Sequence, residues 1–221
     1  TSCLLLGIGL HGYSSTRFLP VVVCVVFLIY SFQLKTKKER NQLLWMFLLL
    51  AICAFFVFLP LFRYLLENPG MFSYRASTRL LPIEQAYPGN PVLIFLQNFW
   101  KAMVMFFYDN GEIWVHSIPH RPALDVVSAV FYFIGFAFGI LRAWKQKDWL
   151  ASAILISIPF LLMPSILSLV FPSENPSLNR PGGAYVLVFV LAGYGWVSLA
   201  QIFLNSWKKK QTRMTLAIGS L

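Results

Sequence analysis

Five long apolar runs constrain the fold of this chain more than any other feature of its sequence. They are Phe18–Leu34, Leu43–Phe62, Leu124–Trp144, Trp149–Phe171 and Ala184–Leu204, each 17 to 23 residues long. At ~1.5 Å of rise per residue, helices of this length cross a hydrocarbon core of ~30 Å. Backbone groups in lipid must bond within their own segment, which requires helices here. We therefore predict an all-α, polytopic transmembrane helical bundle.

The composition agrees with a chain that lies almost entirely in a membrane. Hydrophobic residues make up 58% of it and charged residues 12%, against roughly 25% charged in a soluble domain. We predict that residues 1–221 form a single transmembrane domain. The sequence opens on the apolar Thr1–Leu10 without an initiator Met or a basic region, so we interpret it as a fragment of a longer protein. Thr1–Leu10 would then end an earlier span, and Gln211–Leu221 would begin a later one.

Basic residues predict how the spans are oriented. Three turns, Lys35–Arg40, Arg142–Lys147 and Lys208–Arg213, close alternate ends of the runs and hold 11 of the 18 Lys and Arg residues. The positive-inside rule places all three in the cytoplasm. The long segment Arg63–Ala123 and the turn Pro172–Gly183 then lie outside. The net charge of +10 is explained by this topology, so we predict no nucleic-acid partner.

One apolar segment of the outer loop, Pro91–Tyr108, is long enough to be confused with a span. If it crossed, it would place the basic turns on opposite sides of the membrane. Gln97, Asn98 and Lys101 fall on one face at helical spacing. We therefore predict an interfacial helix that lies along the outer headgroups, with its polar face outward and its apolar face downward.

The spans carry no ionisable group at membrane depth, which argues against an ion-driven pump or channel. Cys3, Cys24 and Cys53 lie in apolar runs and are interpreted as small buried hydrophobes. His116 and His120 are separated by Pro119, which makes a shared helical zinc site unlikely to form. We predict no metal and no cofactor, and nothing in the sequence supports a divalent cation.

Two spans carry residues that alter helix packing. Gly135 and Gly139 have the spacing of small residues that let helices approach closely. Pro159 and Pro164 predict kinks in the fourth span, which either disturb the packing or open a cavity toward the outer side.

Four stretches resemble bacterial family 39 glycosyltransferases, relatives of the dolichyl-phosphate-mannose:protein mannosyltransferases. The first contains Gly7-Ile-Gly-Leu-His-Gly-Tyr, and the second Glu67-Asn-Pro-Gly-Met-Phe-Ser-Tyr-Arg75. The third contains Ile118-Pro-His-Arg-Pro-Ala-Leu-Asp125, and the fourth Asn179-Arg-Pro-Gly-Gly183. They occur in the family's order and together extend over most of the chain.

The resemblance implies an enzyme of the bacterial cytoplasmic membrane that transfers a sugar from a polyprenyl-phosphate donor at the outer face. The implied partners are membrane lipid and that donor; a membrane-protein complex is the partner under the subunit alternative given below. The family's acidic base lies in a first outer loop, which would be upstream of Thr1. The catalytic residue is therefore unassigned, and Asp109, Glu112 and Asp125 do not replace it on the sequence alone.

Three arginines, each in a resembling stretch, are candidate ligands for the lipid phosphate: Arg75, Arg121 and Arg180. A guanidinium fork binds phosphate through two parallel hydrogen bonds. Arg180 is preferred because a helix that begins at Pro181–Gly182 would add free amide donors. Alternatively, these arginines bind ordinary headgroups or pair with Glu174 and Asp125.

Two other functions are compatible with the sequence. One is a non-catalytic, glycosyltransferase-like subunit of a larger membrane complex. The other is a lipid or sugar flippase, which is disfavoured because polar residues inside the spans are nearly absent.

Overall fold

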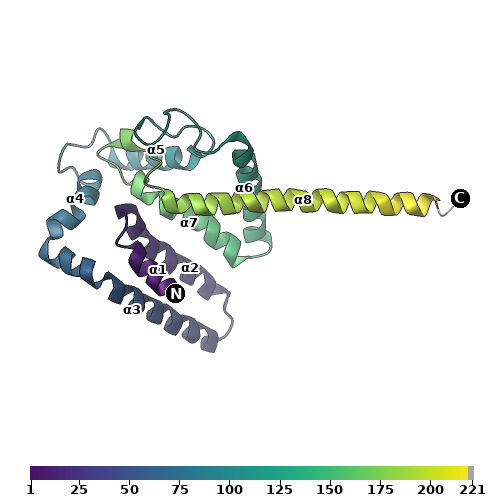
Figure 1. The fold of residues 1–221 in the computed structure, drawn as a ribbon, viewed down its shortest axis with the longest axis horizontal. Helices are drawn as coiled ribbons and strands as arrows, with labels where there is room; N and C mark the ends of the chain where they lie inside the picture. The colour runs from purple at the N-terminus through teal and green to yellow at the C-terminus, as the bar shows by residue number, and fades with distance from the viewer. Residues whose placement is uncertain (219–221) are drawn as a thin grey trace.

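The computed structural model describes the backbone of residues 1–218 and their side chains except those of Ser14 and 208–218. Within this range all regular secondary structure is helical, and loops connect the helices (Figure 1). The elements are α1 (Ser2–Gly9), η1 (Ser14–Phe18), α2 (Leu19–Gln33), α3 (Lys37–Glu67), α4 (Pro69–Leu80), α5 (Pro91–Val104), α6 (Val126–Lys145), α7 (Trp149–Ile166), η2 (Pro172–Glu174) and α8 (Gly182–Ile218). This confirms the all-α fold class.

Five helical segments of the described chain are long and apolar enough to cross a membrane, as predicted. They are Ser15–Gln33, α3, α6, α7 and Gly182–Trp207 of α8. The second of these, α3, extends beyond both ends of its predicted run, and at its start Thr36 and Glu39 form a capping box. The Thr36 hydroxyl accepts from the Glu39 amide, and the Glu39 carboxylate accepts from the Thr36 amide, both at 3.2 Å.

Two predicted boundaries were wrong. The helix α7 ends at Ile166 instead of Phe171, and the following segment bonds to α4 through the Val170 amide and the Arg79 carbonyl at 3.0 Å. The predicted basic turn at 208–213 is a continuation of α8, because no Gly or Pro interrupts the sequence there. Of the predicted later span Gln211–Leu221, residues 219–221 lie outside the described residues.

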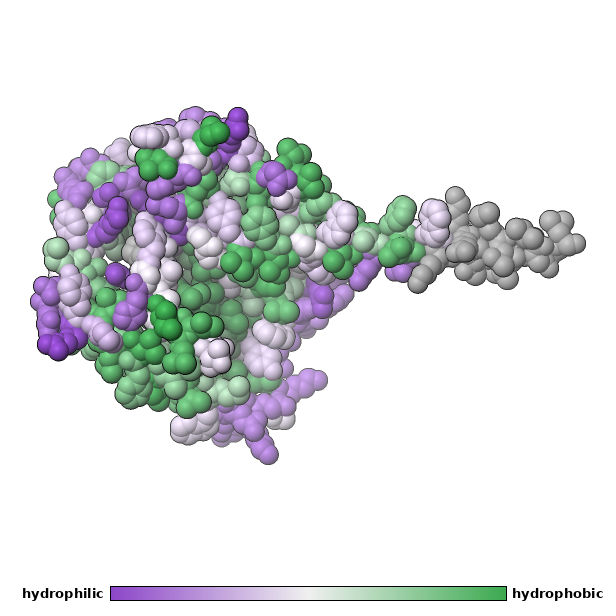
Figure 2. All heavy atoms as spheres, in the orientation of Figure 1, coloured by the Kyte–Doolittle hydropathy of each residue, from purple (hydrophilic) through white to green (hydrophobic). Residues whose placement is uncertain are grey.

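The two remaining basic turns lie at the same end of the bundle. The Gln33 side chain donates to the Lys147 carbonyl, and the Tyr30 and Trp149 rings lie 4.7 Å apart. Figure 2 shows hydrophilic residues gathered over α4 and the neighbouring loop at the upper left and again at the lower edge, with hydrophobic surface between them. The cytoplasmic location of the basic end stays a prediction.

The closest helix crossing lies between α6 and α8, at Gly135 and Gly195. A Cβ added to Gly135 would lie 1.8 Å from the Leu191 carbonyl oxygen, and one added to Gly195 would lie 2.2 Å from that of Phe131. This confirms the close packing predicted for Gly135. At Gly139 the nearest atoms, of Leu155, would be at 3.6 Å, so that position tolerates a side chain.

The helix α5 has 14 residues, too few to cross a bilayer, which needs ~20. This agrees with a helix that does not span, although it ends at Val104 and not at Tyr108. The prediction for Asn98 was wrong, because this side chain is 1% exposed and does not face headgroups. It donates to the carbonyls of Ile166 and Ser168 at 3.0 and 3.1 Å, which join α5 to the end of α7.

Candidate functional site

In the long loop after α5, two segments, residues 105–111 and 118–124, are joined by backbone hydrogen bonds. We call these two segments the paired loop. Four hydrogen bonds of 2.9 to 3.1 Å connect them: Ala123 to Met105, Leu124 to Phe106, Asn110 to Arg121 and His120 to Gly111. Met105 and Phe106 are fully buried and anchor the loop in the helical core. The paired loop therefore has a defined position over the bundle.

The buried Asn110 fixes the returning half of this loop. Its side-chain amide donates to the Ser117 hydroxyl at 2.8 Å and to the Ile118 carbonyl at 3.0 Å. Its backbone amide donates to the Arg121 carbonyl. One asparagine thus holds the chain from Ser117 to Arg121 without any regular secondary structure.

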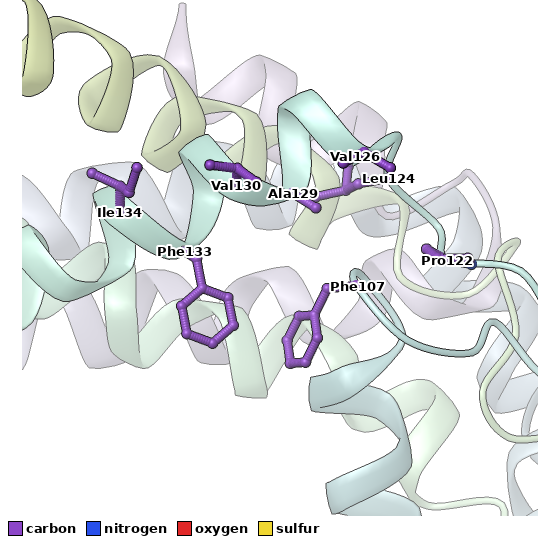
Figure 3. Close-up of a pocket in the computed structure, with 8 residues that line it drawn as sticks. All are labelled: Phe107, Pro122, Leu124, Val126, Ala129, Val130, Phe133 and Ile134. Carbon is purple, nitrogen blue, oxygen red and sulfur yellow. The ribbon is translucent and has the colours of Figure 1, made fainter.

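An apolar pocket of about 340 Å³ lies between the paired loop and the first turns of α6 (Figure 3). It is lined by Phe107, Pro122, Leu124, Val126, Ala129, Val130, Phe133 and Ile134. The Phe107 and Phe133 rings meet edge to face, with centroids 5.2 Å apart. Because no charged side chain lines it, this pocket suits a hydrocarbon chain.

A second, polar pocket of about 190 Å³ lies between α5, the paired loop and the turn after α7. It is lined by Trp100, Lys101, Val104, Tyr108, Asp109, Gly111, Glu112, His120, Ser173, Asn175 and Pro176. Gly111 has a φ of 92°, and a Cβ there would lie 2.6 Å from the Pro176 carbonyl oxygen. Glycine is therefore required where the paired loop meets this turn.

The ionisable groups of the polar pocket differ in how they are engaged. Asp109 accepts from the Gly111 amide at 2.8 Å and lies 3.2 Å from the His120 ring nitrogen. The Gly111 amide is the main cause of the lowered pKa of Asp109, and His120 contributes further. Glu112 is different: of the eight acidic residues, all in the part of the chain with described side chains, it alone has no hydrogen bond or ion pair.

The two pockets are lined by adjacent residues of the same paired loop. Phe107 lines the apolar pocket and Tyr108 the polar one; on the returning half, Pro122 and His120 do the same. Arg121 lies between these last two and is exposed. The arrangement places an apolar site, a cation and a polar site in sequence along one loop.

The three predicted phosphate ligands occupy different surroundings. Arg121 is exposed on the paired loop and Arg75 is exposed on α4. Arg180 is mostly buried and forms an ion pair with Glu174, the alternative considered from the sequence. Among the described residues, Arg180 alone of the three forms a side-chain hydrogen bond or ion pair.

Arg79 was not predicted from the sequence, and it lies at the centre of a charged cluster. Its guanidinium bonds both carboxylate oxygens of Glu174 at 3.0 Å, reaches Glu84 at 3.4 Å and lies 4.3 Å above the Phe171 ring. Burial raises the pKa of Glu174, but hydrogen bonds from Arg180 and Arg79 outweigh it, so the pKa is lowered overall. The charge of Arg180 is therefore shared with a carboxylate and a second arginine.

Metal binding finds no support in the described residues, where no group of three His, Cys, Asp or Glu side chains is placed to hold an ion. Comparisons with protein-family models, curated proteins and solved structures gave no match to this chain.

Proposed function

We propose that this chain belongs to an integral membrane glycosyltransferase that takes a sugar from a polyprenyl-phosphate donor. The observation that carries the proposal is that an apolar and a polar pocket are both lined by the paired loop. A polyprenyl-phosphate sugar has a hydrocarbon tail, an anionic link and a polar head in that order. The apolar pocket, Arg121 and the polar pocket offer matching surroundings in the same order. The four resembling sequence stretches point to the same chemistry.

Among the three arginines, Arg121 is the phosphate ligand that this arrangement favours. Arg180 is already paired with Glu174, and a phosphate would have to displace that carboxylate. Arg75 is exposed on α4 and does not line either pocket. The Arg121 side chain has no hydrogen bond or ion pair among the described residues, and a free guanidinium can donate two parallel hydrogen bonds to a phosphate.

The membrane proposed for this protein is the bacterial cytoplasmic membrane, with both pockets on its outer side. The basic segments 35–40, 142–147 and 208–213 would then face the cytoplasm. The first two of these lie at one end of the bundle, joined through Gln33 and Lys147. The pockets lie beyond the opposite end of α7, where Asn175 and Ser173 contribute to the polar pocket.

The chain's own contribution is to bind and orient the lipid-linked donor. The acidic base that the resemblance implies is expected upstream of Thr1, and further subunits and membrane lipid are the proposed partners. The test uses the full-length protein and measures sugar transfer from a polyprenyl-phosphate donor. Loss of a charge-assisted hydrogen bond of about 1.5–3 kcal/mol predicts that Arg121→Ala lowers transfer roughly 10- to 150-fold.

Arg75→Ala is the matched control, since it removes an exposed arginine from outside the pockets. Its transfer rate should stay within about twofold of the unmodified protein, and both variants should retain the same helical content. Equal activity of Arg121→Ala and Arg75→Ala would exclude Arg121 as the phosphate ligand. No transfer by the unmodified full-length protein, with donor binding intact, would favour the second candidate.

That second candidate is a non-catalytic, glycosyltransferase-like subunit. It is favoured by the engagement of seven of the eight carboxylates in helix caps, ion pairs or hydrogen bonds. Carboxylates held in this way stabilise the fold and are poor proton acceptors. A subunit of this kind would bind polyprenyl phosphate without turning it over.

A further inference from the structure

We infer that the polar pocket is a binding site for a single uncharged sugar ring, with Glu112 and Lys101 as its main hydroxyl partners. This inference rests on the proposed function, because it assigns a sugar to the polar half of the same site. It goes further by naming the ligand class of that half and the side chains that select it.

The size of the pocket restricts the ligand to one small ring. Its volume is about 190 Å³, below the roughly 300–1,000 Å³ of pockets that enclose drug-sized ligands. Gly111 closes one wall by packing directly on Pro176. A Cβ at residue 111 would lie 2.6 Å from the Pro176 carbonyl oxygen, so this wall can form only with glycine at that position.

The charges lining the pocket disfavour a phosphate there. One lysine, Lys101, faces two carboxylates, Asp109 and Glu112, and the lowered pKa of Asp109 keeps it ionised. An anionic ligand would therefore meet two carboxylates and a single ammonium group. Sugar hydroxyls both donate and accept, so they can bond to the carboxylates and to the ammonium group at the same time.

The pocket contains charged side chains that are free to form hydrogen bonds with the hydroxyl groups of a sugar ring. Glu112 and Lys101 have no hydrogen-bond partner among the described residues, and both are exposed to solvent. Asn175 is different, because it is buried and bonds to Ser165 at 2.7 Å and to the Asn98 carbonyl at 2.9 Å. Asn175 thus forms a wall, while Glu112 and Lys101 are available to a ligand.

Aromatic surface completes the site. Trp100 and Tyr108 line the pocket and are 68% and 72% exposed. The apolar C–H face of a sugar ring packs on such rings, while its hydroxyls point away from them toward polar partners. An aromatic face beside a carboxylate and an ammonium group therefore matches both sides of a sugar.

The experiment measures binding of free methyl glycosides of glucose, mannose and galactose to the detergent-purified full-length protein by saturation-transfer NMR. At least one glycoside should bind, and Glu112→Ala should weaken its binding tenfold or more. Glu67→Ala is the matched control, because Glu67 is exposed and pairs only with Arg63 at 2.7 Å. Binding to the control should be unchanged, and circular dichroism should show the same helical content in all variants.

Two further variants keep the inference testable if Glu112→Ala does not fold. Glu112→Gln retains the shape and one acceptor, and should weaken binding less than alanine does; Lys101→Ala should weaken it independently. Competition with a polyprenyl-phosphate sugar distinguishes the source of the ring. Displacement of the glycoside assigns the pocket to the donor sugar, and simultaneous binding of both assigns it to an acceptor sugar.

Binding of inorganic phosphate by the unmodified protein, in competition with the glycoside, would overturn the inference and make the pocket an anion site. Absence of glycoside binding while polyprenyl phosphate still binds would also overturn it, and would leave the proposed function standing. Loss of polyprenyl-phosphate binding with glycoside binding intact would instead count against the proposed function.

Discussion

Replacing Gly135 by alanine should destabilise the bundle, although alanine is the better helix former. The added Cβ would lie 1.8 Å from the Leu191 carbonyl oxygen, where real contacts are rarely under 3.0 Å. The obstructing atom belongs to the backbone of α8, so no side-chain rotation can relieve the clash. The helices α6 and α8 would have to separate by about an ångström at their crossing. Overpacking of this kind costs about 1–3 kcal/mol and sometimes more.

Gly193→Ala is the matched control on the facing helix. A Cβ there meets nothing within 4 Å, so only helix propensity acts. That term favours alanine by up to about 1 kcal/mol. The two substitutions are chemically identical and should have opposite signs. Gly139→Ala, with its nearest atom at 3.6 Å, should fall between them.

The assay is reversible unfolding of the purified protein in mixed micelles, followed by helical circular dichroism. The free energy of unfolding should decrease for Gly135→Ala and stay equal or increase for Gly193→Ala. If Gly135→Ala were as stable as Gly193→Ala, the close approach of the two backbones at Gly135 and Gly195 would be refuted.

The remaining predictions concern the charged cluster and the topology. Glu174→Gln should destabilise the protein by about 1–2 kcal/mol, because Arg79 loses a charge-assisted partner in a site that is only partly exposed. The folded-state pKa of Glu174 is lowered, so its contribution is complete above the ordinary glutamate range near ~4.3 and is lost as pH falls through the lower folded value. Chemical unfolding measured across acidic pH should show that loss in the unmodified protein and not in Glu174→Gln. In a cysteine-free background, a membrane-impermeant thiol reagent added outside the cell should label Gly89→Cys and leave Lys38→Cys unlabelled. The reverse pattern would invert the predicted orientation.

The spans could be predicted from the sequence because a hydrocarbon core imposes a minimum apolar length, whatever the neighbours do. Helix ends depend on more local chemistry. Thr36 and Glu39 extended α3 into a basic segment through a capping box, which a hydropathy argument does not consider. The end of α7 at Ile166 depends on contacts from Asn98 and Arg79, which are distant in sequence.

The candidate site was only partly accessible to sequence reasoning, for a similar reason. Helical spacing places Asn98 on a polar face, but it cannot distinguish a side chain that faces water from one that bonds a buried carbonyl. Arg75 and Arg79 are one helical turn apart on α4, and no local signal indicates which of them reaches Glu174. The pairing of Arg180 with Glu174 could be anticipated, because both lie in one short turn.

The hydrogen bonds of Asn98 have a consequence for how a ligand enters. They satisfy two carbonyls at the end of α7 that would otherwise be buried without a partner, at a cost of about 1–3 kcal/mol each. If α5 moved away from α7, these two hydrogen bonds would break and both carbonyls would lose their partner. We therefore expect α5 and the end of α7 to move together as one rigid unit. The segment from Glu112 to His116 has largely exposed side chains. We expect a ligand to enter the polar pocket from this exposed side, since α5 and the end of α7 form its fixed side.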